Sequence, residues 1–170
     1  MKETIKKTKE YLDYIEEHHA NVQKAWGILC KKCTDMRFIS DDLVFFTIDA
    51  EIKNHDISKL SKEEFIQYRI SFYPTEKETE LGNVERRVGF DEGWEHHKKH
   101  NSHHWETWTK TKEMHPYENE VDCVHMVCDW MAMGFKFKDT AKEYYEKNNE
   151  KIKLPEWAVK FIYEIFDRIN

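Results

Sequence analysis

The sequence predicts an all-α protein, a compact bundle of about seven helices, and three observations support this. Only five Gly and three Pro occur in 170 residues, too few turn residues for a fold of many short strands. Apolar side chains recur at three- and four-residue steps over long stretches. Aromatic residues make up 14% of the chain, which argues for a packed core and against disorder. The length suits one domain spanning residues 1–170.

Four elements are expected in the first half of the chain. A periodic apolar face predicts a helix from Thr4 to about Cys30. A second helix should begin at an acidic cap, Asp41, and end near Asp56. The run from Ser61 to Glu64 reads as a capping box that opens a short helix ending before Pro74. The polar segment from Glu76 to Asn83 is predicted to be a surface loop.

Four more helices follow. The longest is expected from about Val84 to Trp108. A largely buried helix should run from Glu118 to Met133 and stop at Gly134. The last two are expected from Asp139 to about Asn149, and from Pro155 to the C-terminus, since proline suits the first turn of a helix.

Charge and composition exclude several classes of function. With 27 basic and 33 acidic residues the formal charge is −6, which disfavours general nucleic-acid binding and attraction to anionic membranes. No apolar stretch approaches the roughly 20 residues needed to cross a bilayer, and the N-terminus lacks a signal-peptide core, so we expect an intracellular protein. Cys30 and Cys33 have redox or zinc-knuckle spacing but lack two further nearby ligands, which disfavours a cysteine metal site.

Histidine placement is the unusual feature of this sequence. A helix turns about 100° per residue, so the face occupied by each side chain follows from its number. His18 falls on the apolar face of the first helix, between Tyr14 and Val22, and should point inward. In the second helix His55 continues the apolar stripe, and Asp56 follows directly. Both helices are therefore expected to bring polar groups into the interior.

Five of the ten histidines lie between His96 and His104. If this segment is helical, His97, Asn101 and His104 share one side with apolar residues and should point inward. By the same reasoning His96 and His103 fall toward a polar flank and are expected to be less buried.

The helix predicted from Glu118 to Met133 has a single polar stripe, formed by Asp122, His125 and Asp129. A buried carboxylate without a partner costs several kcal/mol, so Asp129 needs a cation or strong hydrogen-bond donors. Any one of these inward polar groups could be a satisfied core residue. Four helices that each direct an imidazole or carboxylate inward favour a site for one or two divalent transition metals, namely Mn, Fe, Ni, Co or Zn.

These residues resemble the signature of the HD-domain metal-dependent phosphohydrolases. That family takes its ligands in the order His, His-Asp, Asp, matched here by His18, His55-Asp56 and Asp129. The string HDISK is similar to the HD-x-x-K variant of cyclic-dinucleotide phosphodiesterases and of di-iron members. The whole chain also resembles an uncharacterised family of small bacterial and phage proteins, through HDISKLSKEEF, WEHHKKHNSHHWE and MVCDWMAMG.

The resemblance implies an HD-like fold and a set of roles. His18, His55, Asp56 and Asp129 would hold the first metal ion, and His97 and His104 a second. Asp56 would bridge the two ions, and Lys59 would hold a phosphate or protonate the leaving oxygen, unless it is an exposed lysine at a helix end. The further candidates on the polar stripes are Asn101, His103, His96 and His125.

The expected function is therefore that of a phosphohydrolase that acts on a nucleotide or another small phosphate ester through metal-activated water. Two alternatives stay open. One is a di-iron oxygenase on an HD scaffold, and the other is a non-catalytic protein that binds a metal or a nucleotide, such as a phage-encoded inhibitor. The expected partner is a small phosphorylated substrate, the expected location is the cytoplasm of a bacterium or of a phage's host, and the oligomeric state is open.

Overall fold

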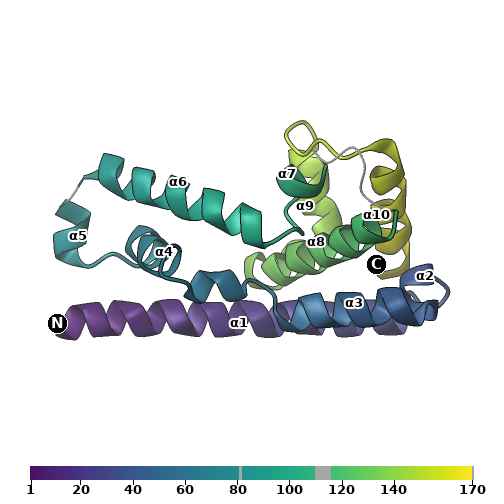
Figure 1. The fold of residues 1–170 in the computed structure, drawn as a ribbon, viewed down its shortest axis with the longest axis horizontal. Coiled ribbons are helices and arrows are strands. Elements are labelled where there is room, and N and C mark those ends of the chain that lie inside the picture. Colours follow the sequence, from purple (N-terminus) through teal and green to yellow (C-terminus); the bar gives the residue numbers. More distant parts are fainter. Residues whose placement is uncertain (81, 110–115, 170) are drawn as a thin grey trace. The chain divides into compact units, whose positions relative to one another are not determined.

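The computed structural model describes residues 1–80, 82–109 and 116–169, and within them every regular element is a helix (Figure 1). The elements are α1 (Lys2–Lys32), α2 (Arg37–Ser40), α3 (Asp42–Lys53), the 3₁₀ helix η1 (Ile57–Leu60), α4 (Phe65–Phe72), α5 (Glu76–Glu80), α6 (Asn83–His100), α7 (Trp105–Trp108), α8 (Pro116–Phe137), α9 (Ala141–Asn148) and α10 (Glu156–Ile169). The all-α prediction is confirmed. Seven of these α-helices have eight or more residues, and α2, α5 and α7 have four or five.

The chain groups into two compact units, each made of two separate stretches. Unit 1 comprises Met1–His19 and Asp56–Asn101, and unit 2 comprises Ala20–His55 and Ser102–Asn170. The single domain expected over residues 1–170 stays a prediction.

Unit 1 is held together largely by aromatic side chains. Helix α4 packs against α6, and η1 contacts both helices. Tyr11 of α1 lies with its ring centroid 5.3 Å from that of Phe65 and 6.0 Å from that of Tyr73. Tyr68 of α4 lies 5.7 Å from Phe90 of α6. Ring pairs at these separations add roughly 0.5–1.5 kcal/mol each beyond the burial of their area, so the rings fix the spacing of the three helices in this unit.

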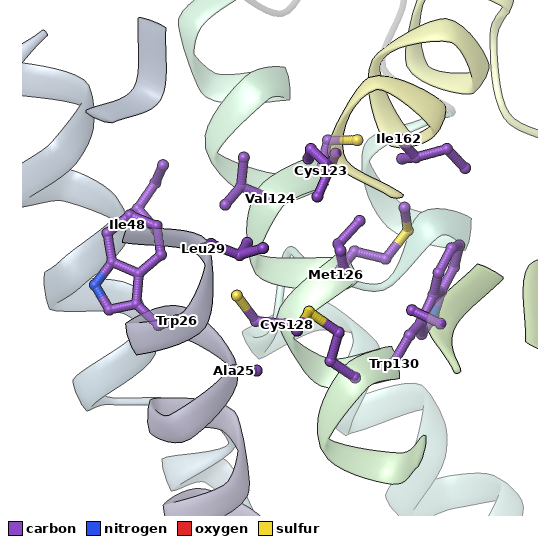
Figure 2. Packing of buried hydrophobic residues seen from close by; sticks show 14 of the residues in the cluster. Ala25, Trp26, Leu29, Ile48, Cys123, Val124, Met126, Cys128, Trp130 and Ile162 are labelled. Atoms are coloured by element: carbon purple, nitrogen blue, oxygen red, sulfur yellow. The ribbon is translucent and has the colours of Figure 1, made fainter. Parts of the chain in front are cut away.

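The core of unit 2 forms around α8, which contacts α3, α7, α9 and α10 (Figure 2). Its buried side chains include Val124, Met126 and Cys128. Trp26 and Leu29 of α1 belong to the same core, as do Ile48 of α3 and Ile162 of α10. Each fully buried aliphatic side chain contributes about 1.5–3 kcal/mol relative to exposure. A helix enclosed on most sides explains why the α8 sequence is apolar with one polar stripe.

Several predicted boundaries are confirmed. Asp41 caps α3, because its carboxylate accepts hydrogen bonds from the backbone N–H groups of Leu43 and Val44. Helix α10 begins directly after Pro155, and its last described residue is Ile169, so Asn170 lies outside the described residues. None of the described helices is long and apolar enough to cross a membrane.

Three sequence expectations are wrong. The predicted capping box does not form, because the α4 N-cap is Glu64 itself and its side chain makes no cap hydrogen bond. The predicted loop from Glu76 contains the short helix α5. Helix α8 continues through Gly134 to Phe137, and the residue with left-handed backbone that follows is Lys138, at φ 62°.

Candidate metal site

The predicted long helix to Trp108 is also wrong, because α6 ends at His100. Asn101 has extended backbone angles, φ −130° and ψ 90°. Its side-chain amide donates 2.8 Å to the carbonyl of His97 and 2.6 Å to the hydroxyl of Ser58. An asparagine side chain that bonds to nearby backbone competes with the helical pattern, and this bond satisfies a carbonyl at the end of α6.

Helical face arithmetic still holds for Asn101, which is buried as expected, but it fails at His103. His103, expected on a polar flank, is 1% exposed. His104, expected to point inward, is the N-cap of the short α7 and is half-buried. Within α6 the arithmetic holds, since His97 is 1% exposed and His96 is half-buried.

Asp56 is the central acidic group of unit 1. Its backbone lies in the left-handed region, φ 56° and ψ 23°, which aspartate tolerates better than most residues and which turns the chain sharply into η1. The ammonium of Lys59 lies 2.6 Å from Oδ2 of Asp56. Nε2 of His97 lies 3.2 Å from Oδ1, and Nε2 of His18 lies 3.8 Å from Oδ2. Three nitrogen groups therefore surround a carboxylate that is 5% exposed.

Glu64 is a candidate site residue that the sequence pattern does not predict, since it places Glu64 only in a helix cap. It is 0% exposed, and its two oxygens lie 2.7 Å from Nδ1 of His96 and 2.8 Å from Nδ1 of His97. The available signal was its position four residues before Tyr68, on the buried side of α4. An imidazole bound through Nδ1 to a carboxylate presents Nε2 to its other neighbour, which for His97 is Asp56.

Two pKa shifts follow from this arrangement. Burial alone would raise the pKa of Glu64, but hydrogen bonds from His97, His96 and Ser58 outweigh it, so the pKa is lowered. Burial would lower the pKa of His97, but its hydrogen bonds to Asp56 and Glu64 outweigh that effect and raise the pKa. Both shifts favour the charged forms, as expected for a network of buried ion pairs.

Unit 2 contains a separate cluster of three histidines. His55 follows the end of α3, His103 precedes α7, and His125 lies on α8. All three are buried, and one nitrogen from each lies within 4.8 Å of the other two. Nδ1 of His55 lies 2.8 Å from Nε2 of His125. Three imidazoles converging in a buried position are a donor set that suits Zn, Fe, Ni, Co or Mn, so the side chains fit a first-row metal ion.

Two carboxylates flank this cluster. Asp129, predicted as a ligand, lies 3.8 Å from Nε2 of His55, on the opposite ring nitrogen from the one that faces His125. Asp122 accepts a hydrogen bond of 2.6 Å from the hydroxyl of Ser102, which ties the segment before His103 to α8. Asp129 therefore lies beside one imidazole of the cluster, and Asp122 contacts the residue that precedes His103.

The predicted site residues divide between the two units. Unit 1 holds His18, Asp56, Lys59, His96, His97 and Asn101, and unit 2 holds His55, His103, His104, His125 and Asp129. Each unit therefore contains its own set of possible ligands. Unit 1 offers two imidazoles around a carboxylate, and unit 2 offers three imidazoles.

Comparison with known families gives one match. A model described as a family of unknown function, DUF5662, matches residues 7–168. The chain belongs to the DUF5662 family. Comparisons with curated proteins and with solved structures gave no match. In this DUF5662 chain, the residues of the two clusters are what bears on the chemistry.

Proposed function

We propose that the protein is a metal-dependent phosphohydrolase that acts on a nucleotide or another small phosphate ester. The observation that supports this most is the buried set of His55, His103 and His125, which is close enough to hold a metal ion. A buried, nitrogen-rich set binds a first-row divalent ion in preference to Mg²⁺ or Ca²⁺, which prefer oxygen ligands.

Asp56 and the two histidines beside it, His18 and His97, form a second group in unit 1, here called the Asp56 cluster. This cluster supports a second ion. The buried carboxylate of Asp56 needs a positive charge beside it. In this structure the ammonium of Lys59, 2.6 Å away, supplies that charge. His97 is oriented for ligation, because Glu64 binds its Nδ1 and leaves Nε2 toward Asp56. His18, stacked on Tyr14 with ring centroids 6.0 Å apart, is the other imidazole beside Asp56, with Nε2 3.8 Å from Oδ2.

When bound, a divalent ion lowers the pKa of water and polarises a phosphoryl oxygen. Hydrolysis forms a bond from the water oxygen to phosphorus and breaks the ester P–O bond, so the leaving oxygen must gain a proton. Lys59 carries such a proton on an ammonium that is largely buried, with 13% of the side chain exposed. Its pairing with Asp56 keeps that ammonium inside unit 1, where it can hold a phosphoryl oxygen before it gives up the proton.

One observation favours a second candidate, an iron-dependent oxygenase. His18 and His97 each lie beside the Asp56 carboxylate, and two histidines with one carboxylate is the composition typical of non-haem Fe(II) oxygenases. Metal identity separates the two functions. Iron with oxygen consumption would favour the oxygenase, whereas Mn, Ni or Co with release of phosphate would favour the hydrolase.

The test is elemental analysis of the full chain purified without a metal-binding tag or chelator, followed by assay on a panel of phosphate esters with Mn, Ni, Co, Mg and Fe. Asp56→Asn should lower turnover on the order of 100-fold, because it removes a ligand charge while keeping a side chain that tolerates left-handed backbone. His103→Gln with His125→Gln should remove the metal of unit 2.

His100→Gln is the matched control, because His100 belongs to the same histidine-rich segment but is exposed. It should keep full metal content and turnover. A protein that contains no metal after purification, binds none on titration and hydrolyses no member of the panel would contradict the proposed function.

A further inference from the structure

Two tyrosines in unit 1 bury hydroxyl groups that have no role in the site as described so far. Tyr11 of α1 is 0% exposed and Tyr68 of α4 is 2% exposed. Neither hydroxyl oxygen has a hydrogen-bond partner among the described residues. A buried hydroxyl left unpaired costs about 1–3 kcal/mol, so two in one unit call for an occupant that supplies acceptors.

Both rings are held in place by packing. Tyr11 packs against Phe65 and Tyr73, and its centroid lies 6.4 Å from that of Tyr14. Tyr68 lies 5.8 Å from His97, with the two rings nearly perpendicular. Rings packed on several sides cannot turn their hydroxyls toward water without opening the unit.

The surroundings identify what the occupant must be. Burial raises the pKa of both phenols, so each keeps its proton and acts as a donor. Each hydroxyl interacts electrostatically with Asp56 and Glu64, and Tyr11 also with Lys59. The ammonium of Lys59 lies 5.7 Å over the ring of Tyr14. Two neutral donors near the ammonium of Lys59 suit an oxygen-rich, negatively charged acceptor.

We propose that the hydroxyls of Tyr11 and Tyr68, together with the ammonium of Lys59, form a subsite that holds the oxygens of a phosphoryl group in unit 1. This inference rests on the proposed function for the choice of phosphate. Because Asp56 and Glu64 are also negative, a phosphate dianion should bind tightly only when a divalent cation balances their charge. The subsite is therefore expected to bind phosphate more strongly in the presence of Mn²⁺.

The test uses inorganic phosphate as the probe, with the full chain and with or without Mn²⁺, by calorimetric titration and by thermal unfolding. Tyr11→Phe and Tyr68→Phe remove only an oxygen atom, so both variants should fold. Each is expected to weaken phosphate binding about tenfold, the effect of one lost hydrogen bond to a charged group. Tyr163→Phe, whose hydroxyl donates to Glu146 in unit 2, is the control and should leave the affinity unchanged.

The outcomes separate this inference from the proposed function. If the chain with Mn²⁺ does not bind phosphate, or if both Phe variants bind it as the parent does, the subsite is overturned. Turnover of esters together with unchanged phosphate affinity in the variants would reject the subsite alone. Phosphate binding that depends on both tyrosines, without turnover of any ester, would keep the subsite and reject the hydrolase.

Discussion

At the scale of single residues, Glu64 shows how one carboxylate can organise a cluster. It is fully buried and holds both His96 and His97 by their Nδ1 atoms. Removing such a group leaves the imidazoles free to choose another tautomer or rotamer, which lowers metal affinity even though no ligand has been lost.

Glu64→Gln is therefore expected to weaken metal binding by the Asp56 cluster about 10- to 100-fold. The measurement is a calorimetric titration with Mn²⁺. A glutamine keeps the size of the side chain but loses the charge and one of the two acceptors that the histidines share. Glu63→Gln changes the exposed neighbour and should leave the affinity unchanged. A variant with unchanged affinity but lower melting temperature would show that Glu64 has only a structural role.

The residue scale also shows why only part of the candidate site was predictable. His18 and His97 are buried as helical periodicity predicted, because each lies within a continuous helix. His103 was assigned to the wrong environment because Asn101 ends α6, and a side chain that bonds to its own helix is not visible in a pattern of apolar residues. The sequence pattern does not single out Tyr68, and nothing in it signals that this buried hydroxyl lacks a hydrogen-bond partner.

At the scale of elements, Gly134 allows the end of α8 to pack against the segment that follows. A Cβ atom at this position would lie 2.5 Å from the backbone oxygen of Asp139. The sequence predicts that the helix stops at this glycine, but the glycine instead allows a close approach between backbones inside a helix that continues to Phe137.

Gly134→Ala is expected to destabilise the protein by about 1–3 kcal/mol, because the clash is with backbone, which cannot move aside as a flexible side chain could. The measurement is urea denaturation. Gly27→Ala is the matched control, since a Cβ there meets nothing within 4 Å and the change should stabilise α1 by up to about 1 kcal/mol. Stabilisation by both changes would contradict the steric explanation.

At the scale of the whole molecule, helix content was predictable and the grouping of helices was not. Periodicity, the Asp41 cap and Pro155 mark helices that the structure contains. The division into two units depends on which surfaces pack together, and apolar faces of similar composition do not specify their partners. The short helix α5 was missed because its five residues bury no side chain and so leave no apolar pattern.

At low pH, the stability of the whole chain should depend on a bidentate ion pair between Arg69 of α4 and Glu78 of α5. The two terminal guanidinium nitrogens of Arg69 donate to Glu78, and these hydrogen bonds are the main reason that the pKa of Glu78 falls from 4.5 to about 2. A lowered folded-state pKa contributes stability that is present above about pH 4.5 and is lost as the pH falls toward 2.

Glu78→Gln is therefore expected to lower stability by about 2–3 kcal/mol at neutral pH, because it leaves the buried Arg69 without its carboxylate. Between pH 4.5 and 2, the melting temperature of this variant should also decrease less than that of the parent protein. Thermal unfolding followed by circular dichroism across this range is the measurement. Glu80→Gln is the control, because Glu80 is exposed on the same helix, and it should behave as the parent does. If the melting temperature of the Glu78 variant depends on pH as steeply as that of the parent, the role assigned to the Arg69–Glu78 pair is contradicted.

The composition of each unit from two distant stretches of chain has a practical consequence. Unit 1 needs residues from the N-terminus and from the middle, and unit 2 needs Ala20–His55 as well as the C-terminal part. Truncation from either end of the polypeptide would therefore remove part of one folded unit, and it would not yield the other unit alone. To study one histidine cluster by spectroscopy, the histidines of the other cluster should therefore be substituted in the intact chain.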